Sequence, residues 1–246
     1  MTTVLISGAN KGLGAGFVEK YLSRPNTTVI ATVRNPDAAD SKGLFSLPKA
    51  EGSKLIVVKI ESTSPTDALE AVESIKSQGI THLDVVISNA GIFKTEAFQE
   101  VAVMKTTDLL EHVNVNAAGP VRLFQATLPL LKAAKQPKFI YISSGVATIS
   151  AAEYIPYTVT SYGASKAAMN FLLRRIHIEN EDLIALAFHP GAVQTEEGNA
   201  AARFFGLPGA NVSVEEAVNG VTAKIDSATR ETSGKFLAFD DTPLAW

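Results

Sequence analysis

Short runs of β-branched and apolar residues alternate along this chain with longer stretches of helical periodicity, and no other feature constrains the fold as strongly. The runs contain few polar residues, which is typical of parallel strands covered on both faces. Alternating strands and helices predict an α/β fold with a doubly wound parallel sheet and right-handed crossovers. We expect strands at 3–7, 28–33, 54–59, 84–88, 138–143, 183–188 and 235–239, helices at 13–23, 66–78, 106–135, 161–180 and 214–228, and a short helix within 36–53.

The composition is that of an ordinary globular protein, with 246 residues of which 46% are hydrophobic. No repeat, low-complexity tract or linker divides the chain, so we expect one domain over residues 1–246. The net charge of −3 gives no electrostatic reason to expect nucleic acid or an anionic membrane as a partner.

The absence of cysteine excludes disulfides and thiolate metal sites, and the four histidines lack the spacing of metal ligands. We therefore expect no metal. The first apolar run, Val4–Ile6, leaves no room for a secretory signal, and no apolar run approaches the roughly 18 residues that span a bilayer. These observations favour a soluble, cytoplasmic protein.

A glycine-rich turn follows the first expected strand and leads into a helix. Glycines here allow a tight turn and let a pyrophosphate approach the helix N-terminus, where free N–H groups favour anions. Alone, such a turn is often only a tight connection, but its place after the first strand of an alternating α/β chain predicts a nucleotide site. The cofactor-binding candidates in the turn are Gly8, Asn10, Lys11, Gly12, Leu13 and Gly14.

Charge at the end of the second expected strand indicates which dinucleotide such a glycine turn would hold. Proteins that bind NAD usually carry an acidic residue about 20 residues beyond the glycines, where it accepts a hydrogen bond from the ribose. This chain has Arg34 at that strand end and no acid there. Arg34 and Lys11 would pair with a 2′-phosphate, so we expect NADPH or NADP. The alternative is that both cations are solvated surface charges.

Tyr162 and Lys166 lie one turn apart on an expected helix and project from the same face. Free tyrosine titrates near about 10, and a cation in contact lowers the pKa of an acidic group by roughly 1–3 units. The pair therefore predicts a phenol whose pKa is lowered toward neutrality, where proton donation to a carbonyl oxygen is most effective. Alone the pair is weak support, because tyrosines and lysines often share a helix face by chance.

Five motifs occur along the chain in one order: the glycine turn, Asn89-Ala90-Gly91, Ser143-Ser144, Tyr162-x-x-x-Lys166 and Pro190-Gly191. In this set and order the chain resembles the short-chain dehydrogenase/reductase family over essentially its whole length. Within the family it resembles sniffer-type carbonyl reductases and fungal norsolorinic-acid ketoreductases. The resemblance implies a Rossmann-type fold and an oxidoreductase that acts on carbonyl or CH–OH groups with a nicotinamide cofactor.

The resemblance implies a catalytic role for three side chains. Tyr162 would donate a proton to the substrate, Lys166 would tune that tyrosine and bind the nicotinamide ribose, and Ser144 would hydrogen-bond the substrate oxygen. Ser143 is the competing choice, because the alternation of a strand places only one of the two serines in the site. The interval between Ser144 and Tyr162 is several residues longer than the family usually shows.

Asn116 matches the asparagine of the family's Asn-x-x-Gly pattern, in which the main-chain carbonyl holds a water that passes protons to the lysine. The chain offers its own physical reason, since Pro120 has no N–H for the carbonyl four residues earlier. An unpaired buried carbonyl needs water or another polar partner. We expect Gly119-Pro120 to break the helix and free the Asn116 carbonyl, with Asn114 as a near-neighbour alternative.

By the same resemblance, further residues would contact the cofactor. Glu61 takes the place of an aspartate that meets the adenine amine, although its side chain is one methylene longer. The segment 89–91 would flank the adenosine ribose, and Val193 and Thr195 would lie near the carboxamide and phosphates. The complete set carried over is Glu61, Ser62, Asn89, Ala90, Gly91, Tyr162, Lys166, Pro190, Gly191, Val193 and Thr195.

Two segments without clear periodicity, 146–160 and 194–209, are expected to be substrate loops, since loops at the carboxyl ends of strands usually carry specificity. Their aromatic residues suggest a hydrophobic or aromatic carbonyl compound, unless these rings only pack the loops: Tyr154, Tyr157, Phe204 and Phe205.

We therefore expect an NADPH-dependent carbonyl reductase. The alternative is a non-catalytic NADP-binding sensor or scaffold on the same fold. Related enzymes often pair through the helix that carries Tyr162, so a homo-oligomer is possible.

Overall fold

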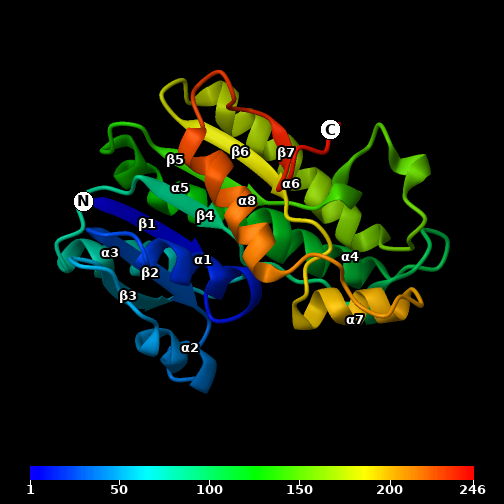
Figure 1. Cartoon of the computed structure of the whole chain (residues 1–246). Helices are drawn as coiled ribbons and strands as arrows, with labels where there is room; N and C mark the ends of the chain where they lie inside the picture. Colours follow the sequence, from blue (N-terminus) through cyan, green and yellow to red (C-terminus); the bar gives the residue numbers. More distant parts are fainter.

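The computed structural model describes all 246 residues, and its centre is a seven-stranded sheet in the order β3-β2-β1-β4-β5-β6-β7 (Figure 1). Every pairing between neighbouring strands is parallel. The predicted doubly wound α/β fold is confirmed. The strands are β1 Thr2–Ser7, β2 Thr27–Val33, β3 Lys54–Lys59, β4 Val85–Ser88, β5 Lys138–Ile142, β6 Ile184–His189 and β7 Phe236–Ala238.

Helices cover both faces of the sheet, and each face has its own apolar core. One cluster of 25 buried residues joins the sheet to α3, α5 and α6, and a second cluster of 22 joins it to α1 and α8. The helices are α1 Gly12–Leu22, α2 Ala39–Gly43, α3 Asp67–Ser77, α4 Thr106–Val113, α5 Gly119–Lys132, α6 Thr160–Glu179, α7 Glu196–Phe204 and α8 Val214–Ser227. None of them is both long and apolar enough to cross a membrane.

The alternation of side chains along β5 decides which of them point toward α5 and α6 and which toward α1 and α8. Ile140 and Ile142 point into the core beneath α1 and α8, whereas Phe139 and Tyr141 point toward α5 and α6. Successive side chains of a strand point to opposite faces, so this division follows directly from the strand geometry. Tyr141 is therefore placed on the same side of the sheet as the helix that carries Lys166.

Two expected elements differ from the structure. The helix predicted over 106–135 is α4 and α5 joined by a π-helical turn at Asn114–Ala118, because Pro120 has no N–H to continue the regular ladder. The segment 194–209, expected to be a loop, contains the nine-residue helix α7. Its start is fixed by Thr195, whose side chain accepts a hydrogen bond from the Gly198 N–H at 3.0 Å.

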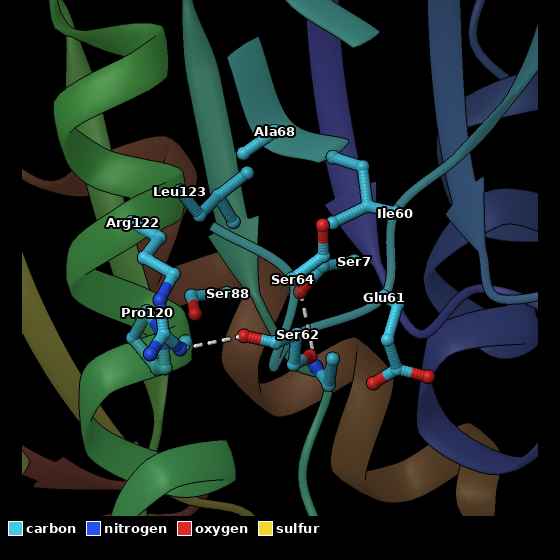
Figure 2. Close-up of a pocket in the computed structure, with 12 residues that line it drawn as sticks. Ser7, Ile60, Glu61, Ser62, Ser64, Ala68, Ser88, Pro120, Arg122 and Leu123 are labelled. Atoms are coloured by element: carbon cyan, nitrogen blue, oxygen red, sulfur yellow. Dashed lines mark hydrogen bonds between the residues drawn. The ribbon is translucent and has the colours of Figure 1, made fainter. Parts of the chain in front are cut away.

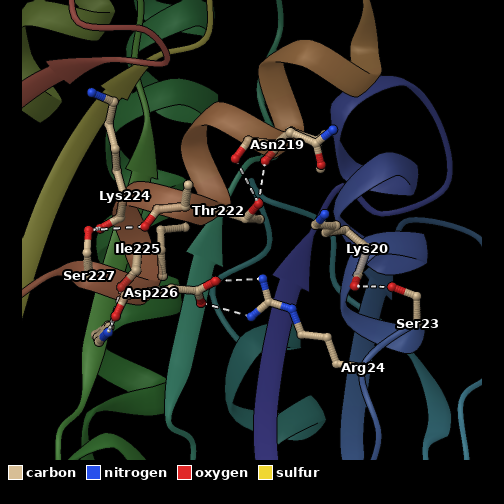
Figure 3. Close-up of polar contacts among 12 residues, drawn as sticks. Lys20, Ser23, Arg24, Asn219, Thr222, Lys224, Ile225, Asp226 and Ser227 are labelled. Carbon is tan, nitrogen blue, oxygen red and sulfur yellow. Dashed lines mark hydrogen bonds and ion pairs between the residues drawn. The ribbon is translucent and has the colours of Figure 1, made fainter.

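Helices α1 and α8, which cover the same face of the sheet, are joined at their C-terminal ends. Arg24, just beyond α1, donates two hydrogen bonds of 2.8 Å to the carboxylate of Asp226 on α8 (Figure 3). The guanidinium also lies over the ring of Tyr21, 4.5 Å from its centroid. This bidentate contact orients α1 against α8 below the glycine turn.

The last residues of the chain lie against the segment 146–160. The Trp246 ring stacks on Phe236 of β7 with centroids 5.6 Å apart. Its main-chain oxygen accepts hydrogen bonds from the N–H groups of Ile149 at 3.2 Å and Ser150 at 3.1 Å. The side chain of Ser150 donates a further bond of 2.9 Å to the same oxygen. The end of the chain is thus connected directly to one expected substrate loop.

Candidate active site

The turn between β1 and α1 forms a cradle that only glycine permits. Gly8 and Gly12 have φ values of 63° and 54°, in the left-handed region. A side chain at Gly14 would begin 2.0 Å from the Gly8 carbonyl oxygen, closer than atoms approach. No side chain caps the N-terminus of α1, so its N–H groups are free to meet an anion. The turn therefore fits the pyrophosphate of a dinucleotide.

Asn89 holds this turn against the neighbouring strand. Its side-chain amide donates to the main-chain oxygens of Ser7 at 2.9 Å and Gly8 at 3.1 Å. The N–H groups of Asn89 and Ala90 in turn donate to the Ser7 hydroxyl, each at 3.0 Å. The glycine turn and the Asn89-Ala90-Gly91 segment, the first and second of the five motifs, are thereby fixed to each other at the carboxyl ends of β1 and β4.

A pocket beside this turn contains Glu61, the residue expected near the adenine, together with Ser62. Figure 2 shows Glu61 and Ser62 on one side of the pocket and Pro120 and Arg122 of α5 on the other. The Arg122 guanidinium donates to the Ser62 carbonyl and to the Asn114 side chain, both at 2.8 Å. Sequence reasoning missed Arg122, whose only signal was its place two residues beyond Pro120 of the Asn-x-x-Gly-Pro segment. Asn114, the alternative to Asn116, is engaged here.

The two expected phosphate-binding cations are in different environments. The Lys11 ammonium forms ion pairs with Glu197 and, at 3.3 Å, with Glu196 in the first turn of α7. Arg34 is exposed at the end of β2 and has no side-chain partner. Lys11 is thus held by two carboxylates here, and the expectation that both cations serve one phosphate stays a prediction. The sequence pattern did not place the carboxylates of α7 near the glycine turn.

The two serines after β5 point to different partners. Ser143 is buried and its hydroxyl donates to the side-chain oxygen of Asn170 on α6 at 2.7 Å. Ser144 faces Tyr162 instead, and its hydrogen bond lowers the pKa of that phenol. The alternation anticipated from the sequence thus leaves Ser144 as the serine on the side of Tyr162.

The electrostatics of Tyr162 and Lys166 differ from the expectation. Burial raises the pKa of Tyr162 to about 12, and only the Ser144 hydrogen bond opposes that rise. Burial also lowers the pKa of Lys166 to about 7. The predicted lowering of the tyrosine pKa is wrong for this structure, because withdrawal from water disfavours both charged forms. The Lys166 ammonium donates to the Ile142 carbonyl at 2.8 Å and lies 5.6 Å from the centroid of the Tyr162 ring.

Asn116 joins the π-helical turn to its surroundings through its side chain. The side-chain oxygen accepts from the Ile92 N–H at 2.8 Å, and the amide nitrogen donates to the Ile92 carbonyl and to the Ser165 hydroxyl, each at 3.0 Å. The Ser165 hydroxyl donates to the Tyr162 carbonyl at 2.7 Å. Asn116 is fully buried, so these bonds fix α6 relative to the segment after β4.

The main-chain carbonyl of Asn116 has a partner that the sequence did not reveal. The Tyr141 hydroxyl donates to it at 2.9 Å. The predicted helix break is a widened π turn rather than an end of the helix, with Gly119 and Pro120 in the first turn of α5. The polar partner expected for this carbonyl is therefore present, but it is a phenol from β5.

Aromatic side chains from three segments cover the outer side of Tyr162. The Phe93 ring lies 4.2 Å from the Tyr162 ring between centroids and 4.8 Å from Phe98. Phe98 stacks on Phe205 of the α7 segment at 5.4 Å, and Tyr157 of the segment 146–160 meets Phe205 at 4.5 Å. The two expected substrate segments thus meet each other through an aromatic cluster that ends on the phenol.

Removal of the two serine hydroxyls is expected to affect stability differently. Ser143→Ala takes away the only hydrogen bond of the Asn170 side chain, whose amide nitrogen is already buried without a partner. We expect it to lower the free energy of unfolding by about 1–3 kcal/mol, whereas Ser144→Ala should leave it nearly unchanged. Urea unfolding of the two variants measures the difference, and equal losses would contradict the assignment of Ser143 to the core.

Comparisons with known proteins agree with this fold and this arrangement of motifs. The family model described as short chain dehydrogenase matches residues 2–204, and the chain belongs to that family of oxidoreductases. The family inferred from the five motifs is confirmed.

Similar proteins cover nearly the full chain. The short-chain dehydrogenase RED3 of Pyricularia oryzae is 44% identical over 248 residues, covering 100% of this chain and 98% of the relative. The norsolorinic acid ketoreductase of Aspergillus parasiticus is 41% identical over 250 residues, covering 100% of this chain and 91% of the relative. These relatives agree with the resemblance to fungal ketoreductases.

Among solved structures, the NADPH-bound carbonyl reductase from chicken fatty liver superposes with a TM-score of 0.87 at 29% identity, covering 100% of this chain and 99% of that chain. The carbonyl reductase Sniffer of D. melanogaster superposes with a TM-score of 0.86 at 25% identity and full coverage of both chains. The carbonyl reductases expected from the sequence motifs are thus among the structural neighbours.

Proposed function

We propose that this protein is an NADPH-dependent carbonyl reductase that reduces a hydrophobic or aromatic ketone or aldehyde. The observation that carries the proposal is the convergence of Ser144, Tyr162 and Lys166 with the buried Asn116 at the carboxyl ends of β4 and β5. A sensor or scaffold that only binds NADP has no chemical need for a serine aimed at a half-buried phenol. The carbonyl-reducing activities named for similar proteins also support the proposal.

The chain's residues fit a nicotinamide dinucleotide, which when bound supplies the hydride. The glycine turn and the uncapped start of α1 would hold its phosphates. Arg34, the unpaired cation at the end of β2, would hold a 2′-phosphate, and no acidic residue stands at that strand end. The solved carbonyl reductase at 29% identity is described as NADPH-bound. We assign the remaining cofactor contacts to the residues inferred from the family motifs, within one domain over 1–246.

In this mechanism the protein supplies a proton and a fixed orientation for the carbonyl oxygen. Tyr162 donates the proton, and Ser144 donates a hydrogen bond to the same oxygen. A phenol with a pKa of about 12 keeps its proton throughout the neutral range, which is the form that a reduction requires. The aromatic cluster above the phenol excludes water and favours an apolar substrate.

Tyr162→Phe is expected to abolish reduction while leaving the fold and the cofactor site intact. A general acid typically contributes about 100-fold to 10,000-fold in rate, so kcat with a panel of activated ketones should fall by at least that lower factor. NADPH binding, followed by the nicotinamide fluorescence, should be unchanged. Tyr21→Phe is the matched control, because the Tyr21 hydroxyl has no hydrogen-bond partner and lies in the core on the other face of the sheet. Wild-type protein that binds NADPH but reduces none of the panel would instead favour the sensor or scaffold.

Arg34→Glu is expected to reverse the preference between the two nicotinamide cofactors. Loss of a charge-assisted contact to the 2′-phosphate should raise the KM for NADPH by about tenfold to a hundredfold, and NADH should be used better. Lys11→Ala should have the smaller effect, because its ammonium is already paired with α7. Steady-state kinetics with both cofactors measure this change. An unchanged KM for NADPH in Arg34→Glu would contradict the assignment of Arg34 to the 2′-phosphate.

The activity is expected to fall as the pH rises through about 7. The folded-state pKa of Lys166 is depressed to about 7 by burial, so its ammonium is charged below that pH and neutral above it. If the charged form orients the cofactor and phenol, kcat/KM for reduction is highest below pH 7. A pH profile of kcat/KM measures this, with substitution of the exposed Lys76 of α3, Lys76→Met, as the control and Lys166→Met as the variant that should lose the inflection.

A further inference from the structure

The side chain of Tyr141 has two polar neighbours although it belongs to the apolar core beneath α5 and α6. It is 0% exposed, and its hydroxyl donates to the Asn116 carbonyl at 2.9 Å. Ile140 and Ile142, which flank Tyr141 and point to the opposite face of the strand, are purely apolar. A buried hydroxyl is retained at low cost only where it is hydrogen-bonded, so its pairing with the π-helical turn is a specific contact.

The ring of the same residue faces the Lys166 ammonium. The Lys166 nitrogen lies 4.8 Å from the Tyr141 ring centroid, closer than the 5.6 Å that separates it from the Tyr162 ring. No carboxylate forms an ion pair with Lys166, and its hydrogen bond goes to the Ile142 carbonyl. Attraction between a cation and an aromatic face is strongest where both are withdrawn from water.

The surroundings of Lys166 contain few other groups that titrate. Tyr141 faces it from β5 and Tyr162 from its own helix, while His112 of α4 lies edge-on to Tyr162 at 6.4 Å between ring centroids. Gly91 approaches from the turn after β4, where an added side chain would begin 3.6 Å from the Lys166 nitrogen. The aromatic faces are thus the main favourable surroundings for the positive charge besides main-chain carbonyls.

We propose that Tyr141 is a positioning residue for the proposed reduction. Its ring holds the Lys166 ammonium in place next to Tyr162, and its hydroxyl fixes the Asn116 carbonyl of the π-helical turn. One rigid side chain on a central strand thereby sets the relative positions of the lysine helix and the asparagine turn. The inference rests on the proposed function for its kinetic consequence, but the contacts on which it is built do not depend on the substrate.

The two contacts can be separated by two substitutions. Tyr141→Phe keeps the ring and removes the hydroxyl, whereas Tyr141→Leu removes both. Phe139→Leu is the matched control, because Phe139 is equally buried on the same face of β5 and packs on Phe124 rather than on Lys166. All three variants should be less stable than the wild type in urea, so stability alone does not distinguish a positioning role.

The decisive measurement is the titration of Lys166 in full-length protein, followed by NMR of selectively labelled lysine and by the pH profile of kcat/KM with NADPH and a ketone. In Tyr141→Leu we expect the Lys166 midpoint to fall by about half a unit to one unit, as loss of a desolvated cation–π contact implies. Tyr141→Phe should retain the wild-type midpoint but lose severalfold in kcat with an unchanged KM for NADPH. Phe139→Leu should retain both the wild-type Lys166 midpoint and the wild-type kcat.

Equal midpoints in Tyr141→Leu and Phe139→Leu would overturn the role of the ring, and an unchanged kcat in Tyr141→Phe would overturn that of the hydroxyl. If Tyr141→Leu does not fold, Tyr141→Met fills more of the space and takes its place. A wild-type protein that reduces no carbonyl compound contradicts the proposed function instead, and in that case the NMR midpoint still decides whether the Tyr141 ring stabilises the ammonium.

Discussion

The side-chain amide of Asn116 is the contact on which the geometry of the site depends. A single buried amide satisfies both the N–H and the carbonyl of Ile92 and also reaches Ser165 on α6. Through these bonds the segment after β4, the π-helical turn and the helix that carries Tyr162 keep fixed relative positions. Because buried polar groups without partners are costly, the three segments hold one another in place only when all of these bonds are made together.

Burial then determines the chemistry of the groups that this contact positions. The same withdrawal from water holds the pKa of Tyr162 at about 12 and that of Lys166 at about 7. The phenol stays protonated, and the ammonium becomes the group whose charge varies near neutral pH. A site with a permanently charged lysine and an acidic tyrosine would require more solvent or an opposing charge, and the surroundings here provide aromatic faces and main-chain oxygens instead.

Local patterns in the sequence predicted the features that depend on neighbouring residues. The strands, most helices, the glycine turn and the cluster around Tyr162 follow from periodicity and motif order. Features that depend on tertiary packing could not be predicted from local sequence patterns. The choice between Ser143 and Ser144 needed Asn170, a residue on another element. The raised pKa of Tyr162 reflects burial, which spacing alone does not report. Lys11 pairs with α7 because that short helix folds back onto the glycine turn, and nothing in its own pattern indicated this.

Sequence reasoning did not identify Tyr141, because an aromatic residue in an apolar strand cannot be distinguished from an ordinary core residue.

The contact of Trp246 with Ile149 and Ser150 could not be predicted from the sequence either. It has a consequence for the aromatic cluster, because Trp246 holds the segment that carries Tyr157, one ring of that cluster. Substitutions at the last residues would therefore change the wall of the aromatic cluster while leaving the sheet and Tyr162 untouched.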